Sequence, residues 1–259
     1  KEVKTHADEK GCWELQITTP AASFEEYTLT LTDGEQSVTL QHLLIGEVWL
    51  CAGQSNMVMP LNGFDYCPIS DSNNVIADAP NHPGIRMVTI KPTVKLSPQE
   101  YAEGSWQQPT TENAPKFSAA AYHYALTLQR TLQIPIGVIT CAWGGSRVEG
   151  WLPKEILQTY KDEDLTLIGS DKTPVYLQSM LMYNGILYPC HKYTIKGFIW
   201  YQGESNVRSS RTYAERLATM VKHWRSIWKQ GDLPFYYVET VPFACEYKED
   251  GYIGALLRE

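Results

Sequence analysis

From Gly46 onwards the chain alternates short apolar runs with helical stretches, and this alternation restricts the possible folds more than any other feature of the sequence. The apolar runs predict five strands, with the sequences EVWLCA, IRMVTI, PIGVITCAW, KGFIWYQ and FYYVET. Strands that are separated by helices pair in parallel, and a parallel sheet needs cover on both of its faces. The sequence therefore predicts an α/β fold with a parallel sheet between two layers of helices.

Two segments between the predicted strands, residues 118–133 and 211–230, have the apolar spacing of amphipathic helices. The apolar face consists of Ala121, Ala125, Leu128 and Leu132 in the first segment, and of Tyr213, Leu217, Met220, Val221, Trp224 and Trp228 in the second. Because such a stripe packs against a core, both segments are predicted to be helices that lie on the sheet.

Residues 1–45 have a different pattern, in which apolar residues occupy every second position. The runs CWELQIT and YTLTLTD predict two strands, and Asp33-Gly34 predicts a turn before a third, SVTLQHLLIG. These antiparallel strands are too few to make a stable domain. We therefore expect residues 1–45 to be the C-terminal strands of a β-rich domain that begins upstream, and residues 46–259 to form the α/β domain.

Charge and apolar content limit the possible partners. The chain of 259 residues has a formal net charge of −7 and no block of Lys and Arg, which argues against nucleic acid and anionic membranes as partners. No run approaches the roughly 18–20 apolar residues that span a bilayer. A neutral or weakly polar small substrate fits better. The 8 Trp and 16 Tyr residues would suit stacking against sugars, or would simply belong to the core and its rim.

The six cysteines show neither a C-x-x-C pair nor a Cys/His spacing typical of metal sites, so no metal site is predicted. Cys51 and Cys141 lie inside apolar strands, where a buried free thiol is expected. Three others, Cys67, Cys190 and Cys245, lie in loop-like contexts and could form disulfides. The opening residues lack the apolar region of a signal peptide, so we expect any leader to have been removed.

The segment CAGQSNM carries a serine directly after the first strand of the predicted sheet. Gly53 lets the backbone turn where the strand stops, and Ser55 falls where a helix would begin, among its free N–H groups. A serine in this position can act as a nucleophile while its own N–H stabilises the resulting oxyanion. The alternative is that Ser55 only caps the helix. Because Met57 replaces the second glycine of G-x-S-x-G, the usual α/β-hydrolase turn is not indicated.

The segment CAWGGSRVEGW follows a second strand. Gly144 and Gly145 have no side chains, so a backbone N–H there can approach a ligand closely, although an ordinary turn would have the same sequence. Arg147 and Glu149 could bind a substrate or pair with each other.

The segment WYQGESN follows a third strand. The amides of Gln202 and Asn206 could donate to an oxyanion, and the Glu204 carboxylate could orient an imidazole or contact a sugar hydroxyl. A solvated turn is the alternative, but three polar functions directly after an apolar strand are costly unless they bind something.

Together the three segments indicate acyl transfer, with Ser55 as the nucleophile and with backbone and amide donors around it. The base is not evident from the residues. The chain has six histidines, His6, His42, His82, His123, His191 and His223, and none follows an Asp by three residues at the end of a strand.

The longer motifs GEVWLCAGQSNMVMPL, IGVITCAWGGSRVEGW and IKGFIWYQGESN resemble, in the same order, the blocks of the sialate O-acetylesterase group of SGNH hydrolases, which is related to acetyl-xylan esterases. The resemblance extends over most of residues 27–259 and includes FSAAAYHYALTL and YNGILYP. It implies a flavodoxin-like three-layer α/β/α fold after a β-sandwich-like domain, of which residues 1–45 would be the last strands. It also implies a secreted or periplasmic enzyme.

The resemblance further implies an enzyme that removes acetyl groups from sugar hydroxyls through a serine acyl-enzyme, without a metal or other cofactor. Ser55 would be the nucleophile, with Glu204 as the second catalytic residue. The oxyanion and substrate would be bound by residues of all three blocks, namely Gln54, Gly144, Gly145, Gln202, Gly203 and Asn206. The substrate would be an acetylated sugar or glycan, with sialic acid favoured, and the resemblance does not specify an oligomeric state.

The sequence departs from the group's pattern at three points. Val58 stands where the motif usually has Glu, and Ser146 replaces the usual Thr. The D-x-x-H segment that supplies the base in this group is absent from the sequence, and we expect it after residue 259. A non-catalytic carbohydrate-binding protein on an esterase scaffold is therefore an alternative, as is an acetyl-xylan esterase.

Overall fold

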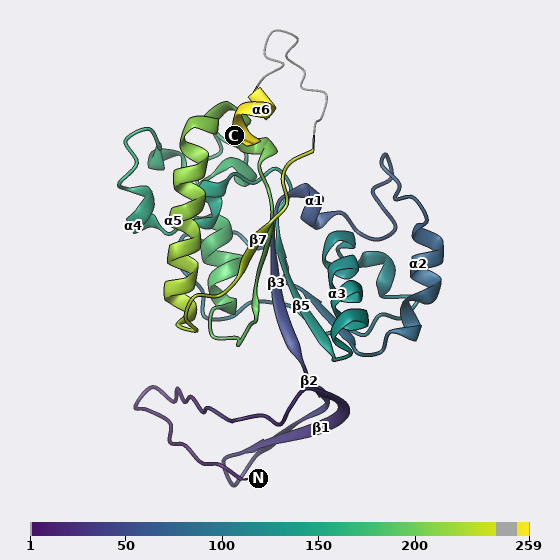
Figure 1. The fold of residues 1–259 in the computed structure, drawn as a ribbon. Coiled ribbons are helices and arrows are strands. Elements are labelled where there is room, and N and C mark those ends of the chain that lie inside the picture. The colour runs from purple at the N-terminus through teal and green to yellow at the C-terminus, as the bar shows by residue number, and fades with distance from the viewer. Residues whose placement is uncertain (1, 242–252, 259) are drawn as a thin grey trace. The chain divides into compact units, whose positions relative to one another are not determined.

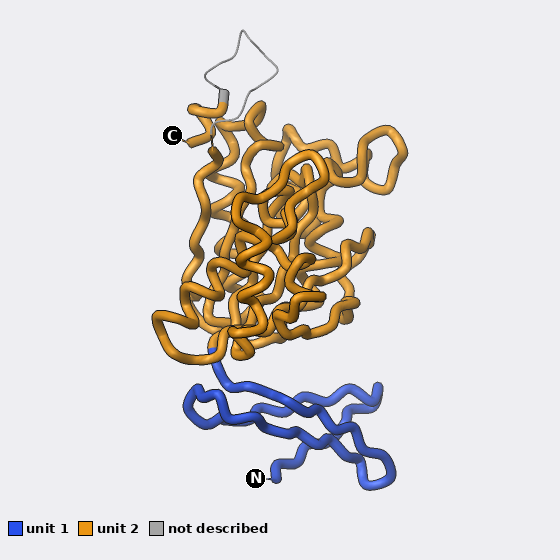
Figure 2. The backbone as a smooth tube through the Cα atoms, turned by 90° about the vertical axis from the view of Figure 1, so that its right-hand side faces the viewer, with its two compact units in different colours: residues 1–46 blue, residues 47–259 orange. Residues whose placement is uncertain are grey.

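The computed structural model describes residues 2–241 and 253–258, and within them the chain forms two separate sheets. The chain divides into two compact units, Lys1–Gly46 and Glu47–Glu259, which are coloured separately in Figure 2. Cys245 lies outside the described residues. Each unit contains one of the two sheets.

The first unit contains an antiparallel hairpin of β1 (Ser23–Thr32) and β2 (Ser37–Ile45). At its turn the Asp33 carboxylate accepts hydrogen bonds from the backbone N–H groups of Gln36 and Glu35, and these bonds lower the pKa of Asp33. The strand predicted for CWELQIT is wrong, because residues 12–18 form no strand in the structure. An alternating pattern indicates which face of a strand would be buried, but it does not supply the neighbouring strand that must pair with it.

The second unit is built on a parallel sheet, as predicted. In the described residues the strand order is β4 (Ile85–Thr89), β5 (Ile136–Ala142), β3 (Glu47–Gly53), β6 (Gly197–Tyr201) and β7 (Phe235–Tyr237). All neighbouring pairs are parallel. Each predicted strand is found. β3 is one residue longer than predicted, and the other four strands are shorter. The α/β fold class is confirmed.

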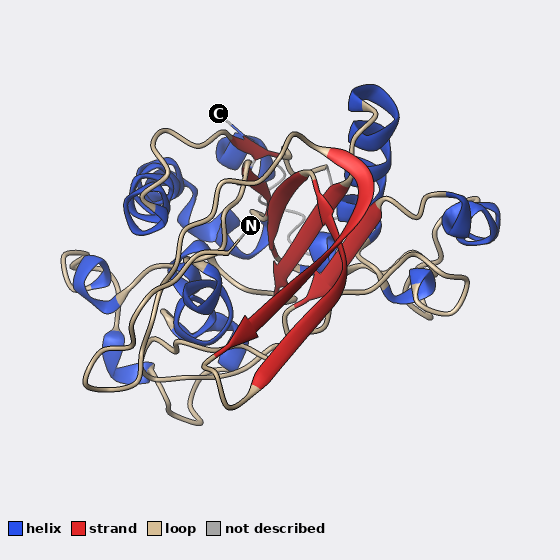
Figure 3. Ribbon diagram, turned by 90° about the horizontal axis from the view of Figure 1, so that it is seen from below, coloured by secondary structure: helices blue, strands red, loops and turns tan. Residues whose placement is uncertain are grey.

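Helices cover both faces of this sheet (Figure 1, Figure 3). The α-helices are α1 (Ser55–Val58), α2 (Ser72–Asp78), α3 (Ala119–Leu132), α4 (Lys154–Leu157), α5 (Ser210–Trp228) and α6 (Ile253–Arg258). Short 3₁₀ helices span Ala79–Asn81, Ala114–Lys116, Val148–Trp151, Leu165–Leu167, Val175–Leu177, Tyr188–Cys190 and Glu204–Ser209, and a π-helix spans Tyr183–Leu187.

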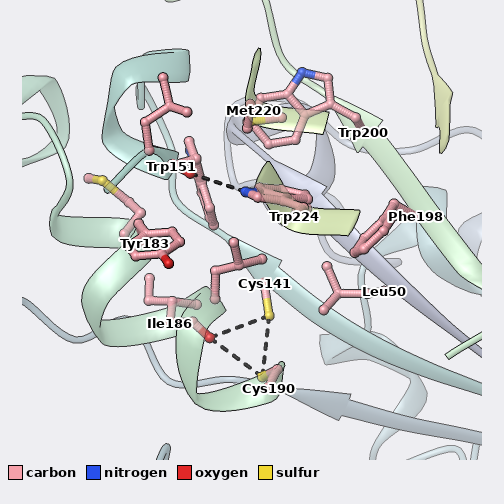
Figure 4. Close-up of a cluster of buried hydrophobic side chains, with 14 of the residues drawn as sticks. Leu50, Cys141, Trp151, Tyr183, Ile186, Cys190, Phe198, Trp200, Met220 and Trp224 are labelled. Carbon is pink, nitrogen blue, oxygen red and sulfur yellow. Dashed lines mark hydrogen bonds between the residues drawn. The ribbon is translucent and has the colours of Figure 1, made fainter. Parts of the chain in front are cut away.

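The two faces of the sheet carry separate apolar cores, and β3 contributes to both. Leu50 belongs to the core beneath α5, together with Phe198 and Trp224 (Figure 4). Its neighbour Cys51 belongs to the core beneath α3. This division follows from the alternation of side chains along a strand. A continuous apolar run is therefore what a central parallel strand requires.

Four residues of the predicted apolar face of α5 are buried, namely Tyr213, Met220, Trp224 and Trp228. The other two, Leu217 and Val221, are half-buried. The predicted face of α3 is only partly right. Its buried residues are Ala119, Ala121, Tyr122, Ala125, Leu126 and Gln129. Leu132, which was predicted to be buried, is 43% exposed. The buried face of the helix is rotated relative to the predicted one, and Leu132 is the last residue of the helix.

Candidate active site

The end of β3 is fixed between its two neighbours. The Gln54 N–H donates to the Tyr201 carbonyl at 3.0 Å, and the Trp143 N–H donates to the Gly53 carbonyl at 3.0 Å. Gly53 has a φ of 144°, and an added Cβ would lie 2.1 Å from the Tyr201 carbonyl oxygen. Only glycine fits this position, where the chain turns from the strand into α1.

Ser55 is the first residue of α1 and is partly exposed. The position before the helix is occupied by Gln54, whose side chain does not cap the helix. Ser55 therefore does not occupy the N-cap position that the alternative interpretation of the sequence assigned to it. Its hydroxyl forms no hydrogen bond with another described residue.

The three polar segments lie at the ends of neighbouring strands. In the sheet register, Gly53 lies beside Ala142 of β5 and beside Tyr201 of β6. The residues that follow these positions therefore lie at one edge of the sheet, where parallel α/β sheets bind their ligands. An added Cβ at Gly144 would lie 3.9 Å from the Cβ of Ser55, so the second segment adjoins the serine side chain.

Gln54 connects the first segment with the third. Its side chain is 3% exposed, and its Oε1 accepts hydrogen bonds from the backbone N–H groups of Gly203 at 3.2 Å and Ser205 at 3.4 Å. Gly203 is itself tightly packed, since an added Cβ would lie 2.4 Å from the Thr240 methyl carbon. The Oε1 of Gln54 thus holds the third strand end in place.

Glu204 lies beside the serine segment. Its Oε1 accepts a hydrogen bond of 2.6 Å from Nδ2 of Asn56, the residue after Ser55. Its Oε2 is buried and has no partner among the described residues. Burial raises the pKa of the neighbouring Tyr201, and the Glu204 carboxylate raises it further. A buried carboxylate oxygen without a partner is costly, so this oxygen is a candidate acceptor for a group that the described residues do not supply.

Gln202 and Asn206 use their amide groups within the protein. Gln202 Nε2 donates to the Ser146 carbonyl at 3.0 Å and to Asn206 Oδ1 at 2.7 Å. Asn206 Nδ2 donates to the Glu149 carboxylate at 3.0 and 3.3 Å, and its Oδ1 accepts from the Val148 N–H at 2.9 Å. Both amides therefore have partners within the protein, and the oxyanion donation predicted for Gln202 or Asn206 stays a prediction.

Glu149, for which the sequence left two roles open, is at the centre of a buried charge network. It has no exposed surface, and it binds the Arg216 guanidinium. Arg216 also binds Asp162 with two hydrogen bonds of 2.7 Å. Arg147 pairs with Glu163 at 2.7 Å and lies 3.8 Å from Glu149. Arg147 and Glu149, the two charged residues of the second segment, therefore form ion pairs within the protein.

The carboxylates of this network raise the pKa of Arg216. Burial by itself would lower the pKa of Arg216, but the carboxylates of Glu149 and Asp162 raise it. A buried pair of this kind fixes geometry more than it adds stability. In this protein it orients Asn206, and through Asn206 it orients the backbone of the second segment.

Two of the three departures from the group's pattern, Ser146 and Val58, lie in different environments. Ser146 is fully buried, and its hydroxyl accepts a hydrogen bond of 3.0 Å from the Trp151 indole. Val58 is 37% exposed at the end of α1.

No histidine hydrogen-bonds Ser55 within residues 2–241 and 253–258. His82 and His191 precede β4 and β6, so they lie toward the opposite, amino-terminal edge of the sheet. His223 contacts the Tyr183 hydroxyl at 2.8 Å, and His123 is exposed on α3. His6 and His42 belong to the first unit.

Two further observations concern the described part of the chain as a whole. No group of three or more His, Cys, Asp and Glu side chains there is arranged to hold a metal ion. None of its helices combines the length and the apolar character needed to cross a membrane.

The sequence alone did not identify Asn56 as the partner of Glu204 or Arg216 as the partner of Glu149. Both pairs join residues that are far apart in the chain. Asn56 does lie inside the recognised G-Q-S-N segment. Arg216 is the one charged residue among the buried residues of α5. Its position predicts a buried carboxylate partner only once the orientation of the helix is known.

A parallel sheet that is covered by helices on both faces, with polar segments at its carboxyl edge, is the fold of SGNH-type esterases. A family model described as "Carbohydrate esterase, sialic acid-specific acetylesterase" matches residues 45–252. The chain therefore belongs to this family.

Individual proteins show the same relationship. The chain is 27% identical to the sialate O-acetylesterase of Homo sapiens in an alignment of 241 residues that covers 88% of this chain and 45% of that protein. It is 25% identical to the sialate O-acetylesterase of Mus musculus, with coverages of 85% and 48%. The chain thus spans about half the length of these curated relatives. A crystal structure of a carbohydrate acetylesterase from Xanthomonas citri matches 97% of this chain and 54% of its own, with a TM-score of 0.83 and 30% identity.

Proposed function

We propose that this chain carries the serine site of an enzyme that removes O-acetyl groups from sugar hydroxyls, with O-acetylated sialic acid as the favoured substrate. The family supports the substrate class. The observation that carries the proposal is the meeting of Ser55, Gly144 and Glu204 at the ends of three neighbouring strands.

In this mechanism the Ser55 hydroxyl oxygen attacks the acetyl carbonyl and its proton passes to a base. The backbone N–H groups of Ser55 and of Gly144 or Gly145 donate to the oxyanion, and each such donor typically contributes about 10²–10³ in rate. The C–O bond to the sugar then breaks, and the base returns the proton to the sugar oxygen. Water attacks acetyl-Ser55 in the same way and releases acetate and the free serine.

No described histidine contacts Ser55, and we propose that the base is the histidine of a D-x-x-H segment, as the resemblance implies. The unpartnered Oε2 of Glu204 supports a second catalytic role at this site, as an acceptor for the N–H of that imidazole or for a sugar hydroxyl. Asn56 would hold the Glu204 carboxylate in place through its hydrogen bond to Oε1.

We further propose that residues 1–45 are the last strands of a β-sandwich-like domain, that residues 46–259 belong to the hydrolase domain, and that the protein is secreted or periplasmic. The exposure of most residues of β2 suits a strand that another part of a larger domain covers.

The test is the variant Ser55→Ala in the intact gene product. We expect it to lose at least about 10³-fold in the hydrolysis of an aryl acetate and of O-acetylated sialic acid, with an unchanged melting temperature. Ser205→Ala, which removes a hydroxyl from the third strand end, is the matched control and should keep its activity. Undiminished turnover by Ser55→Ala would refute the proposal.

A carbohydrate-binding protein without esterase activity is the second candidate, favoured by the absence of a described histidine near Ser55. Titration calorimetry of the intact protein with acetylated sialic acid separates the two. Binding without release of acetate would support the binding protein. Faster release of acetate from acetylated xylan than from acetylated sialic acid would instead favour an acetyl-xylan esterase.

A further inference from the structure

Tyr176 lies against the second segment of the candidate active site. An added Cβ at Gly145 would lie 2.7 Å from Cδ2 and 3.1 Å from Cε2 of the Tyr176 ring. Gly145 follows Gly144, which adjoins the Ser55 side chain. The Tyr176 ring therefore packs against the segment that adjoins the Ser55 side chain.

The loop that carries Tyr176 is held in place by buried polar contacts. The Gln178 side chain is 3% exposed and accepts from the Gly169 N–H at 2.7 Å. Its Nε2 donates to the carbonyls of Ser170 and Thr173, both at 2.8 Å. These three hydrogen bonds close the loop on itself and limit its movement.

Arg147 attaches this loop to the active-site segment. Its Nε donates to the Leu177 carbonyl at 3.1 Å, and its guanidinium also reaches Ser179 at 3.3 Å. Arg147 stands two residues after Gly145, so the same segment that borders Ser55 also fixes the position of Tyr176. This contact gives Arg147 a role that the serine chemistry does not require.

Tyr176 nevertheless remains open to solvent. Its side chain is 40% exposed, and its hydroxyl forms no hydrogen bond with another described residue. Aromatic side chains with a free polar end are typical of sites that bind ligands with both apolar and hydroxyl groups. A pyranose ring has this character, since its C–H face is apolar and its hydroxyls form hydrogen bonds.

We propose that Tyr176 contacts the sugar ring that carries the acetyl group, and that it makes the site prefer sugar esters to simple aryl esters. This inference rests on the proposed esterase function. The acetyl group that reacts is the same in both kinds of ester and needs only the serine and its donors. The sugar of a sugar ester extends beyond them and can contact Tyr176.

The test compares two substrates, O-acetylated sialic acid and 4-nitrophenyl acetate, in the intact protein. For Tyr176→Ala we expect kcat/KM on the sugar ester to fall about 10-fold, chiefly through KM, and the rate on the aryl ester to change less than about 2-fold. Tyr176→Phe should keep most of the sugar activity. Tyr101→Ala, which removes an 89% exposed tyrosine of another loop, should change neither rate.

Tyr176→Leu distinguishes binding from packing, because leucine still covers Gly145 but has no aromatic face. Loss on the sugar ester alone in this variant supports the proposal. Equal losses on both substrates in Tyr176→Ala, restored by leucine, would mean that Tyr176 only supports the loop, and unchanged kinetics would also overturn the proposal. A failure of the serine mechanism is separately visible, because Ser55→Ala would then still hydrolyse the aryl ester.

Discussion

Glu149 shows how single residues far from solvent control the candidate site. Its carboxylate has no exposed surface and depends on Arg216 and Asn206 for its partners. The same Asn206 accepts from the Val148 N–H, four residues after Gly144. The position of the backbone that faces Ser55 is therefore coupled to a charge pair on the far side of the segment.

Removing Glu149 from its ion pair with Arg216 should destabilise the folded protein. For Glu149→Ala we expect the free energy of unfolding to fall by about 3 kcal/mol, because the buried Arg216 keeps only its contacts with Asp162 and Glu163 and the Asn206 amide loses its acceptor. Urea denaturation measures the change. Glu103→Ala, which breaks an exposed pair with Lys91, is the control and should cost at most about 1 kcal/mol. Equal effects of the two substitutions would contradict the account of the network.

The two glycines of the second segment should respond differently to alanine. Gly145 has a φ of 75° and meets the Tyr176 ring, so Gly145→Ala should destabilise the protein by about 1 kcal/mol or more. Gly144→Ala meets only an ordinary contact with Ser55 and should fold normally. Thermal unfolding of the two variants tests this difference, and a lower melting temperature for Gly144→Ala than for Gly145→Ala would contradict it.

At the scale of residues, the sequence could predict which positions lie at the edge of the sheet but not what their side chains bind. Ser55 and Gly144 adjoin each other because they follow strands, and strands were visible as apolar runs. The amides of Gln202 and Asn206 lie at the same edge, yet they turn inward to Ser146 and Glu149. That direction depends on a partner 57 residues away in the chain, which no local pattern contains.

At the scale of elements, the parallel strands were predictable because the central ones are buried on both faces and therefore form continuous apolar runs. The rotation of the buried face of α3 and the absence of a strand at residues 12–18 were not predictable. Both depend on which other elements lie next to the segment in the folded protein. The apolar stripe of α5 is strong enough, with buried Trp224 and Trp228, to fix its orientation without that knowledge.

The packing of α5 has a consequence for the dependence of stability on pH. His223 on α5 donates to or accepts from the Tyr183 hydroxyl, and burial lowers the pKa of His223 below 6.5, with partial opposition from Glu155. The unfolded chain therefore takes up this proton at a higher pH than the folded protein. The stability that neutral His223 contributes is present above about pH 6.5 and is lost as the pH falls.

Urea denaturation between pH 7 and pH 5 tests this expectation. The fall in stability toward pH 5 should be shallower in His223→Gln than in the unsubstituted protein. His123→Gln, which changes an exposed histidine on α3, should leave the slope as it is. An unchanged slope in His223→Gln would show that another group is responsible.

At the scale of the whole molecule, the two units differ in how much core they contain. The described apolar clusters lie within the second unit, while most of the β2 side chains are exposed. A two-stranded hairpin is at best marginally stable alone. A peptide of residues 1–46 should therefore be unfolded by circular dichroism and by the narrow dispersion of its amide NMR signals. A cooperative thermal transition of this peptide would contradict the proposal that these strands belong to a larger domain.

We propose that the ends of three strands together form a site with one activated serine. A fluorophosphonate, which labels activated serines, tests this proposal most directly. Mass spectrometry of the intact gene product after labelling should find one adduct, on Ser55, that is absent in Ser55→Ala and is suppressed by O-acetylated sialic acid. An adduct on a different serine, or acetate release that persists while Ser55 stays unlabelled, would contradict the claim.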